Sequence, residues 1–407
     1  MLQYCEVCQS PLGKAILDLG LHPLPDDLVS FDSDVEVAQY HQRIVLCEVC
    51  LTAHQTIPVS KEKLFKADYH YRAALTGSVI SGMTDLVEQS IKSINAQNKK
   101  FTVLDIGCND GSLLGIFKKN HLCTTIGVDP TSSIFESGDK IDFKFNEYFS
   151  RSTVDKIKSI SSKIDLITFT NVFAHIENLA ELINNIKLLI TDKTTVIIEN
   201  HYLGSILEKS QFDSFYHEHP RTYSLKSFEF ISENLGLNIT DIKFPSRYGG
   251  NIRVTMNSNK ISQELERYKK LEHDYINAFK LLQNTFSNWK IESKPIFESL
   301  LKHGPVYGKA LPARAVMLIN SLGIDNNAMP VVFEQPNSPK VGKYVPGSKI
   351  KILSDRDLLK INPKIIIVWA WHIIDEVVDN LKALNFQGEI WSPLPEFKIY
   401  PTKTKIF

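Results

Sequence analysis

Two pairs of cysteines place the strongest constraint on how the first part of this chain can fold. Cys5-Glu-Val-Cys8 and Cys47-Glu-Val-Cys50 are nearly identical, and 38 residues separate them. Two residues between thiolates let a tight turn present both sulfurs to one cation, and two such turns complete a tetrahedral zinc site. Because protein ligands fill all four positions, a zinc ion held by Cys5, Cys8, Cys47 and Cys50 would be structural. We expect a zinc-binding domain over residues 1–60.

Composition limits the class of protein and its partners. The chain has 407 residues, of which 43% are hydrophobic, enough for two or three domains with their own cores. Lys plus Arg equals Asp plus Glu at 46 each, so no overall field attracts nucleic acid or an anionic membrane. The longest apolar run, residues 365–371, is too short to span a bilayer, and no charged leader precedes an apolar stretch at the N-terminus. We expect a cytoplasmic protein without nucleic-acid or membrane partners.

Short β-branched segments alternate with helical patterns from residue 101 onward. Strands are predicted near residues 102–104, 124–128, 164–168 and 195–198, with helices near 113–117 and 179–190. This alternation is typical of a doubly wound α/β sheet. Ligands of such sheets bind at the carboxyl ends of the strands.

The first of these strands runs into a glycine-rich turn, in the segment Val103-Leu-Asp-Ile-Gly-Cys-Asn-Asp-Gly111. Glycines there let the backbone approach a cofactor closely, and Asp129 ends the next strand, where an acidic residue can accept both ribose hydroxyls. His175 lies near the same edge, and we expect it to line the pocket or cap a helix. The pattern predicts a Rossmann-like S-adenosylmethionine-binding methyltransferase domain over residues 61–258. Its expected cofactor-binding residues are Asp105, Gly107, Asn109, Asp110, Gly111, Asp129 and Asn171.

Groups capable of proton transfer concentrate in Tyr216-His-Glu-His219, after the strand at 196–198. A solvated polar loop is the alternative interpretation. A carbon next to a ketone becomes nucleophilic when its proton is removed, and histidine suits that step near neutral pH. A phenol or a second imidazole could stabilise the enolate oxygen. The carbanion would then attack a sulfonium methyl group in line.

The last third of the chain predicts a second α/β unit over residues 301–407, joined by a linking helix over 259–300. Residues 304–314 resemble a degraded dinucleotide-type turn that could hold a pyrophosphate. Arg314 can pair with phosphate there. Lys340 and Lys343 flank a nearby turn and are equally explained as solvated lysines.

Taken together, these motifs resemble the bacterial nucleotide-sugar C-methyltransferases that act on keto-deoxysugars, over essentially the whole chain. The resemblance implies zinc-binding, methyltransferase and C-terminal domains, with a nucleotide-activated keto-deoxysugar as substrate. It also implies that His219 is the general base, with Tyr216 and Glu218 close to the sugar. Besides the cysteines, the turn and these residues, it is carried by residues 171–176, 202–204, 248–253 and 343–347. The expected substrate-binding residues are Tyr69, Tyr71, Ser78, Glu199, Asn200, Arg314 and Asn320.

Two departures from those relatives fall where the nucleotide diphosphate would be held. Ala310 stands where they generally keep a glycine, and His372 stands where they commonly have asparagine. Two other functions remain open. The methyl group could go to a sugar oxygen or nitrogen, with His219 deprotonating the heteroatom. A zinc ribbon could instead recruit the methyltransferase to RNA or DNA, although the neutral charge argues against this.

Overall fold

The computed structural model describes residues 2–33, 35–64, 72 and 77–401, which form two compact units. The first unit contains the chain up to Lys14, Val45–Ile206 and Glu218–Ile276. The second contains Ala15–Ile44, Leu207–His217 and the chain from Asn277 onward. The segment expected to form one zinc-binding domain is thus divided. Its middle part joins the second unit because β1 packs against a helix of that unit, α10.

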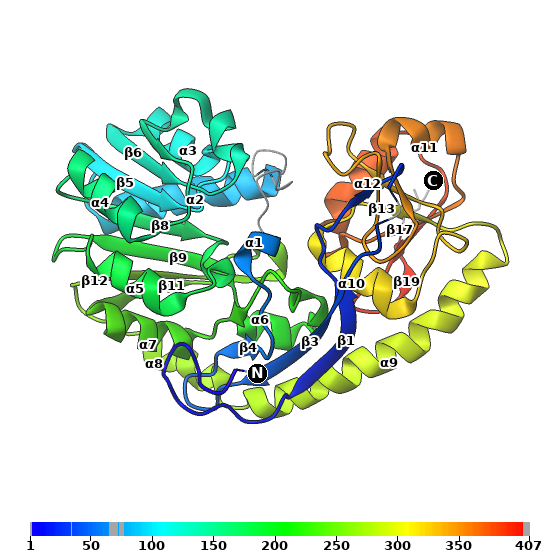
Figure 1. Ribbon diagram of the computed structural model, residues 1–407, viewed down its shortest axis with the longest axis horizontal. Coiled ribbons are helices and arrows are strands. Elements are labelled where there is room, and N and C mark those ends of the chain that lie inside the picture. Colours follow the sequence, from blue (N-terminus) through cyan, green and yellow to red (C-terminus); the bar gives the residue numbers. More distant parts are fainter. Residues whose placement is uncertain (1, 34, 65–71, 73–76, 402–407) are drawn as a thin grey trace, which may run out of the picture. The chain divides into compact units, whose positions relative to one another are not determined.

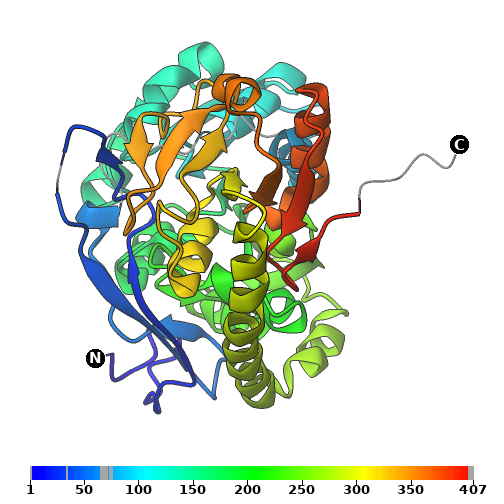
Figure 2. The same ribbon diagram turned by 90° about the vertical axis from the view of Figure 1, so that its right-hand side faces the viewer.

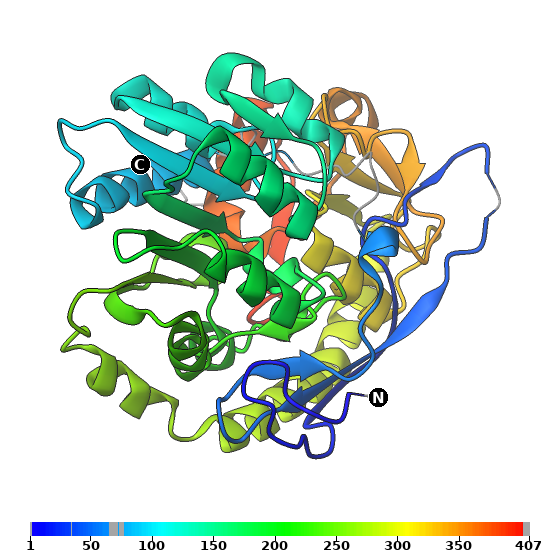
Figure 3. The same cartoon turned by 60° about the vertical axis from the view of Figure 1, so that its left-hand side comes forward.

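A seven-stranded sheet forms the centre of the first unit (Figures 1 and 3), in the order β11-β12-β9-β8-β5-β6-β7. The five strands from β9 to β7 are parallel, while β12 and β11 are antiparallel additions at one side. The doubly wound sheet predicted from the sequence is confirmed. The strands are β5 (Phe101–Ile106), β6 (Cys123–Val128), β7 (Phe143–Phe145), β8 (Leu166–Thr170), β9 (Thr195–His201), β11 (Asn238–Lys243) and β12 (Asn251–Asn257).

Helices cover both faces of this sheet, which is why its strands are apolar almost throughout. On one face, α2 (Gly77–Ser93) and α3 (Ser112–Asn120) enclose a core that includes Leu86 and Phe117. The other face packs against α4 (Arg151–Ile160), α5 (Leu179–Lys187) and α7 (Leu225–Leu235). Shorter elements are α1 (Lys61–Leu64), η2 (Ser132–Lys140), η3 (Phe173–His175), α6 (Leu203–Glu208), η5 (Arg247–Gly249), α8 (Leu265–Lys269) and η6 (Lys270–Glu272).

The cysteine turns belong to the core of the first unit. Cys5, Cys47 and Cys50 are buried in the same apolar cluster as α5 and α7. Directly after the second turn, β4 (Ala53–Gln55) pairs antiparallel with β10 (Arg221–Thr222). The segment that carries His219 therefore runs into a strand that is held by the cysteine region.

The second unit contains an eight-stranded sheet (Figure 2), in the order β19-β18-β17-β13-β14-β16-β15-β2. Its inner strands, from β18 to β16, are parallel and lie within residues 301–407, where the sequence predicts a second α/β unit. The strands are β2 (Val29–Ser30), β13 (Tyr307–Lys309), β14 (Val331–Glu334), β15 (Lys343–Tyr344), β16 (Lys351–Ser354), β17 (Ile365–Val368), β18 (Glu389–Ser392) and β19 (Lys398–Ile399). Outside this sheet, β1 (Leu17–Pro23) pairs antiparallel with β3 (Gln39–Leu46).

The expected linking helix is interrupted. After α8 and η6, the main helix of the region is α9 (Tyr275–Leu301). Glu272 lies at the interruption, where its buried carboxylate accepts hydrogen bonds from the backbone N–H groups of Leu225 and Lys226, at 2.6 and 3.0 Å. The other helical elements are η4 (Phe212–Ser214), α10 (Ala313–Leu322), α11 (Asp355–Ile361), η7 (Trp371–Ile373) and α12 (Ile374–Ala383). None of the helices in the described ranges is long and apolar enough to cross a membrane.

Candidate active site

The turn between β5 and α3 depends on two glycines. Gly107 and Gly111 have φ angles of +75° and +72°, in the left-handed region that favours glycine. A Cβ atom on Gly107 would overlap the side chain of Val172, and one on Gly111 would lie 2.8 Å from the Cβ of Ser137. The Gly107 N–H donates to the Val128 carbonyl of the next strand at 2.7 Å. The turn is therefore held tightly against the edge of the sheet.

Three carboxylates surround this turn. Asp129 accepts hydrogen bonds from the backbone N–H groups of Asn109 and Thr131, both at 2.8 Å. Asp110 accepts a hydrogen bond from the N–H of Ser112 at 3.1 Å, in the first turn of α3. Asp105 is buried inside the sheet and accepts a hydrogen bond from the Thr168 hydroxyl at 2.7 Å. Burial raises the pKa of Asp105 to about 7, and the nearby charge of Asp129 acts in the same direction.

Asn171 adds an amide from the loop that follows β8. Its φ angle is +54°, a conformation that asparagine tolerates better than most residues. Its N–H donates to the Glu199 carbonyl at 2.7 Å, and its Oδ1 accepts from the Asn251 side chain at 3.0 Å. Because the carboxyl ends of parallel strands share one edge, the predicted cofactor residues from three loops lie along that edge.

Three imidazoles gather beside the same edge. His219 is 6% exposed, and its ring centroid lies 4.8 Å from that of His175 and 5.0 Å from that of His201. His175 belongs to η3, after β8, and His201 is the last residue of β9. The ring of Tyr248 stacks on His201 with centroids 5.7 Å apart. His219 therefore lies against the ends of two parallel strands.

Hydrogen bonds and burial distinguish the other histidines from His219. His175 Nδ1 donates to the backbone carbonyl of Glu218 at 2.7 Å, and burial lowers the pKa of His175 to about 4. His217 Nε2 lies 3.3 Å from the Tyr40 carbonyl, and burial lowers its pKa to about 4 as well. Tyr216 is half-buried and, with His217, belongs to the second unit, whereas Glu218 and His219 belong to the first.

Two predicted substrate residues in the first unit have partners within the protein. The fully buried carboxylate of Glu199 pairs with Arg247 and with Arg253, and it accepts a further hydrogen bond from Asn251 at 3.0 Å. In the amide orientation that satisfies both of its groups, Asn200 donates to the Glu199 carbonyl and accepts from the Ala174 N–H, both at 3.1 Å.

The remaining substrate residues divide between the second unit and the undescribed part of the chain. Arg314 pairs with Asp213 at 2.7 Å and lies over the ring of Trp371, 4.9 Å from its centroid. Asn320 donates to the carbonyls of Val316 and Pro346, at 2.7 and 3.1 Å. Tyr69 and Tyr71 lie outside the described residues, and Ser78 is described only as a backbone position in α2. All of these assignments stay predictions.

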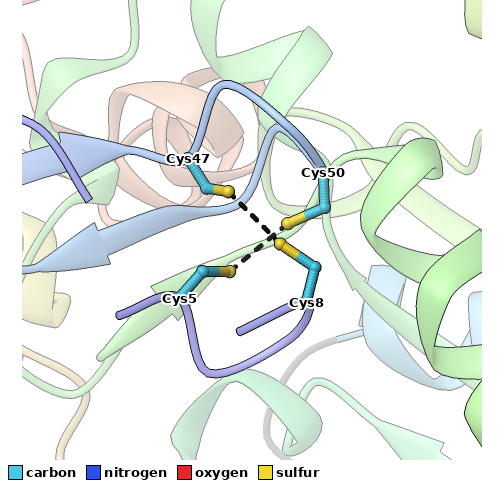
Figure 4. A group of neighbouring side chains, drawn as sticks. All are labelled: Cys5, Cys8, Cys47 and Cys50. Atoms are coloured by element: carbon cyan, nitrogen blue, oxygen red, sulfur yellow. Dashed lines mark hydrogen bonds between the residues drawn. The ribbon is translucent and has the colours of Figure 1, made fainter. Parts of the chain in front are cut away.

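The four predicted metal ligands lie together (Figure 4), with their sulfur atoms all within 4.8 Å of one another. Cys5 and Cys50 are 3.4 Å apart at Sγ, and Cys8 and Cys47 are 3.5 Å apart. A tetrahedral ion with bonds of about 2.3 Å to sulfur requires sulfurs about 3.8 Å apart, so one metal ion fits this set.

Polar contacts connect the cysteine region with the imidazole cluster. The Gln55 side chain donates to the His219 carbonyl at 2.8 Å, and the Gln55 N–H donates to Pro220 at 2.9 Å. Arg221 pairs with Glu6 inside the first cysteine turn and also donates to the backbone of the His175 loop. The sequence interpretation missed Gln55 and Arg221 because hydrogen bonds to a backbone carbonyl leave no residue pattern. It also gave no role to His201 or Tyr248, although His201 closes a buried strand and Tyr248 precedes two glycines.

Comparison with known proteins agrees with this architecture. A family model described as a methyltransferase domain matches residues 79–242, and one described as a C-methyltransferase C-terminal domain matches residues 246–395. The C-methyltransferase NovU of Streptomyces niveus is 23% identical over 414 aligned residues, which cover 99% of this chain and 98% of that protein.

Two solved structures are similar to about half of the chain. An S-adenosylmethionine-dependent methyltransferase from Clostridium acetobutylicum ATCC 824 is 17% identical with a TM-score of 0.35, covering 49% of this chain and 96% of that one. The PH0226 protein of Pyrococcus horikoshii OT3 is 13% identical with a TM-score of 0.36, covering 49% and 98%. At such low TM-scores these two likenesses add nothing to the assignment.

A parallel sheet with a glycine turn after one strand and an acidic residue after the next is the arrangement of S-adenosylmethionine-dependent methyltransferases. One of the two family models and the relative NovU are both described as C-methyltransferases, in which a carbon atom receives the methyl group. The chain is an S-adenosylmethionine-dependent C-methyltransferase.

Proposed function

We propose that this C-methyltransferase acts on a nucleotide-activated keto-deoxysugar, at a carbon next to the ketone, with His219 as the general base. The product would serve the synthesis of a surface polysaccharide or another glycoconjugate. The substrate class rests on the resemblance of the Tyr216–His219 motif to that of the keto-deoxysugar enzymes. One observation carries the mechanism, namely the burial of His219 between two other imidazoles at the cofactor edge of the sheet.

The reaction needs a base that can lie close to both carbon and cofactor. His219 would take the proton from the carbon, and the electrons of that C–H bond would form the enolate. S-adenosylmethionine, when bound, supplies the methyl group through its sulfonium centre. The nucleophilic carbon would attack that methyl group while the C–S bond breaks, and the proton on His219 would pass to solvent. Tyr216 and Glu218 would orient the sugar, consistent with their positions beside the base in the sequence.

Methylation in deuterated water tests this proposal. A panel of nucleotide-linked 4-keto-6-deoxysugars would be incubated with the enzyme and S-adenosylmethionine, and the products analysed for mass and labelled position. We expect methylation at carbon and deuterium next to the ketone. His219→Gln should abolish both while S-adenosylmethionine affinity stays within about twofold. The matched variant His217→Gln should keep most of the activity, because His217 donates to Tyr40 and a glutamine can still do so. Turnover at an oxygen or nitrogen without exchange would refute the enolate.

We also propose that the four cysteines hold one structural zinc ion. Their geometry supports this, since their sulfurs lie within 4.8 Å of one another. Four protein ligands would complete the coordination of the ion and leave no position for a substrate. Purified protein should contain about one zinc per chain by elemental analysis. Cys8→Ser or Cys47→Ser should lose the metal and unfold at lower temperature, since binding of a structural zinc ion stabilises the folded state. Cys123→Ser is the control, because Cys123 lies on β6, and it should retain the metal. Full zinc content in both ligand variants would contradict the assignment.

A further inference from the structure

A second imidazole lies at the reacting edge with no role in the base-catalysed step described above. His201 ends β9, two residues beyond Glu199, which pairs with Thr170 of the parallel strand β8. On its other side His201 is opposite Asn251 of β12. Its side chain is half-buried. The histidine therefore stands at the carboxyl edge of the sheet, between the loop of Asn171 and the segment of Tyr248.

The ring of His201 is enclosed on two sides. Tyr248 stacks on it with an interplanar angle of 29°, and His219 meets it nearly edge-on at 69°. The centroid distances are 5.7 and 5.0 Å. Two flanking rings limit the orientations that an imidazole can adopt, and one of them belongs to the proposed base.

Tyr248 holds this position in a disfavoured conformation. Its φ and ψ angles are 54° and 24°, in the left-handed region that a bulky aromatic residue rarely occupies. The next two residues, Gly249 and Gly250, also have positive φ angles of 92° and 131°. Two contacts hold the turn in place. The Gly250 N–H donates to the backbone carbonyl of Arg247 at 2.9 Å, and the Arg247 side chain pairs with Glu199. Such strain persists at functional sites where the surroundings hold it in place.

The third imidazole is unsuited to donate a hydrogen bond to an enolate. His175 donates through Nδ1 to the carbonyl of Glu218, and its pKa lies near 4 because of burial. In a neutral imidazole with the proton on Nδ1, Nε2 is only an acceptor. His219 must likewise be neutral, because only an unprotonated ring nitrogen can accept the proton that it removes. His201 lies at the end of β9 with its ring centroid 5.0 Å from that of the base, which makes it the imidazole of this cluster best placed to donate.

We propose that His201 is a catalytic residue that donates an N–H hydrogen bond to the enolate oxygen, and that Tyr248 is the positioning residue that orients it. This inference rests on the proposed function. When His219 removes the proton, negative charge grows on the former ketone oxygen, and the His201 N–H stabilises it. The oxygen loses this charge when the enolate electron pair forms the new C–C bond and the ketone is restored, and the electrons of the broken C–S bond would stay on the cofactor sulfur. His201 keeps its own proton throughout, so the step balances without another reactant.

Exchange of the substrate proton with deuterated solvent tests the role of His201 directly. In His201→Ala we expect both exchange and kcat to fall about 100-fold or more, as on removal of one oxyanion donor. S-adenosylmethionine affinity should be unchanged, and KM should change far less than kcat. His201→Gln, which retains an N–H donor, should recover part of the rate. A wild-type rate in His201→Ala would overturn the inference, as would a rate loss fully explained by lost cofactor binding.

Variants of Tyr248 separate positioning from simple packing. Tyr248→Phe keeps the stacked ring and should therefore lose less of the rate than Tyr248→Gly. Tyr248→Gly removes the ring and relieves the left-handed backbone, so the unfolding temperature should rise or hold while exchange falls about 10-fold. Equal losses of stability and rate in Tyr248→Gly would show a structural role and overturn the assignment of Tyr248.

The two proposals fail in different ways. If the wild-type enzyme shows neither carbon methylation nor exchange with any keto-deoxysugar, the proposed function fails and this inference fails with it. If the wild type exchanges and His201→Ala exchanges equally fast, the base-generated enolate stands and the inference about His201 alone is refuted.

Discussion

The two parallel sheets of this enzyme contain the same turn in different chemical surroundings. In each, a strand ends in a residue with positive φ, Gly107 at +75° after β5 and Ala310 at +61° after β13. Both residues donate their N–H to the next strand, at 2.7 and 2.9 Å. An acidic side chain at the end of that next strand then accepts an N–H of the turn. These bonds join Asp129 to Asn109 at 2.8 Å and Glu334 to Leu311 at 2.6 Å.

The charges around the two turns differ. At the second turn, Lys309 pairs with Asp355 at 2.9 Å, and Lys340 donates to the Leu311 carbonyl at 2.8 Å. Around the first turn, Asp105 and Asp129 accept hydrogen bonds from hydroxyl and backbone N–H groups. A lysine donates to a backbone carbonyl of each turn, since Lys140 donates to the Asp110 carbonyl at 3.2 Å. The difference lies in the buried carboxylates, because Asp355 pairs with a lysine and Asp105 accepts from a hydroxyl. The two turns thus share a backbone geometry but differ in the partners of their buried carboxylates, and the sequence predicts the cofactor at the first turn.

The largest difference should appear in cofactor affinity when the two acidic residues are exchanged for alanine. Asp129→Ala should weaken S-adenosylmethionine binding about a thousandfold, because two hydrogen bonds to a charged acceptor contribute about 1.5–3 kcal/mol each. Glu334→Ala, its structural counterpart, should leave affinity within about twofold. Isothermal titration calorimetry measures both. Similar losses in the two variants would show that the second turn also contributes to cofactor binding.

The pH dependence of stability should distinguish a buried carboxyl without a cationic partner from one that has such a partner. Burial raises the pKa of both Asp105 and Asp355, but Lys309 partly reverses the rise for Asp355. Because the folded pKa of Asp105, about 7, exceeds that of the unfolded chain, its protonated form stabilises the fold. This stability should be complete below about pH 4 and should be lost between about pH 4 and 7, by about 4 kcal/mol, because the pKa differs by about three units between the two states.

Denaturant unfolding of the cofactor-free protein at several pH values tests this loss, with circular dichroism as the signal. Asp105→Asn keeps an acceptor for the Thr168 hydroxyl and should flatten the dependence between pH 4 and 7. Asp355→Asn is the comparison and should change it much less. An unaltered profile in Asp105→Asn would mean that other groups cause the dependence.

The sequence predicted those elements whose residue patterns depend only on near neighbours in the chain. The strands β5, β6, β8 and β9 and the turn with Gly107 and Gly111 lie where the alternation placed them. Glycines at positive φ, an acidic residue after a buried strand and paired cysteines all depend on near neighbours in the chain. The four cysteines also came together as expected, because a two-residue spacing fixes each pair on one turn.

Features that depend on strand pairing between distant segments could not be predicted in this way. Gln55 reaches the His219 carbonyl only because β4 pairs with β10, more than 160 residues later in the chain. The ring contact between His201 and Tyr248 likewise needs β12 to pair with β9 in one register. Arg314 was expected to bind phosphate, yet its pairing with Asp213 follows from the packing of η4 on α10. Sequence spacing carries no information about such contacts.

The smallest predicted effect concerns the residue that sets the two turns apart. Ala310 adopts the left-handed conformation that Gly107 adopts in the first sheet, and for alanine this costs about 1 kcal/mol. Ala310→Gly should therefore stabilise the second unit by about 0.5 kcal/mol, because the greater freedom of an unfolded glycine offsets part of the gain. All four tryptophans (Trp289, Trp369, Trp371 and Trp391) lie in this unit, so their fluorescence during denaturant unfolding reports on it alone.

The reciprocal variant completes this comparison. Gly107→Ala places a methyl group against Val172 as well as imposing the backbone strain, so it should destabilise the first unit by several times as much. Cofactor affinity should fall in Gly107→Ala and stay constant in Ala310→Gly. If Ala310→Gly instead lowers the denaturant midpoint, the methyl group of Ala310, which packs against the core of the second sheet, contributes more than its backbone conformation costs. Packing of the Ala310 methyl group would then stabilise the second turn.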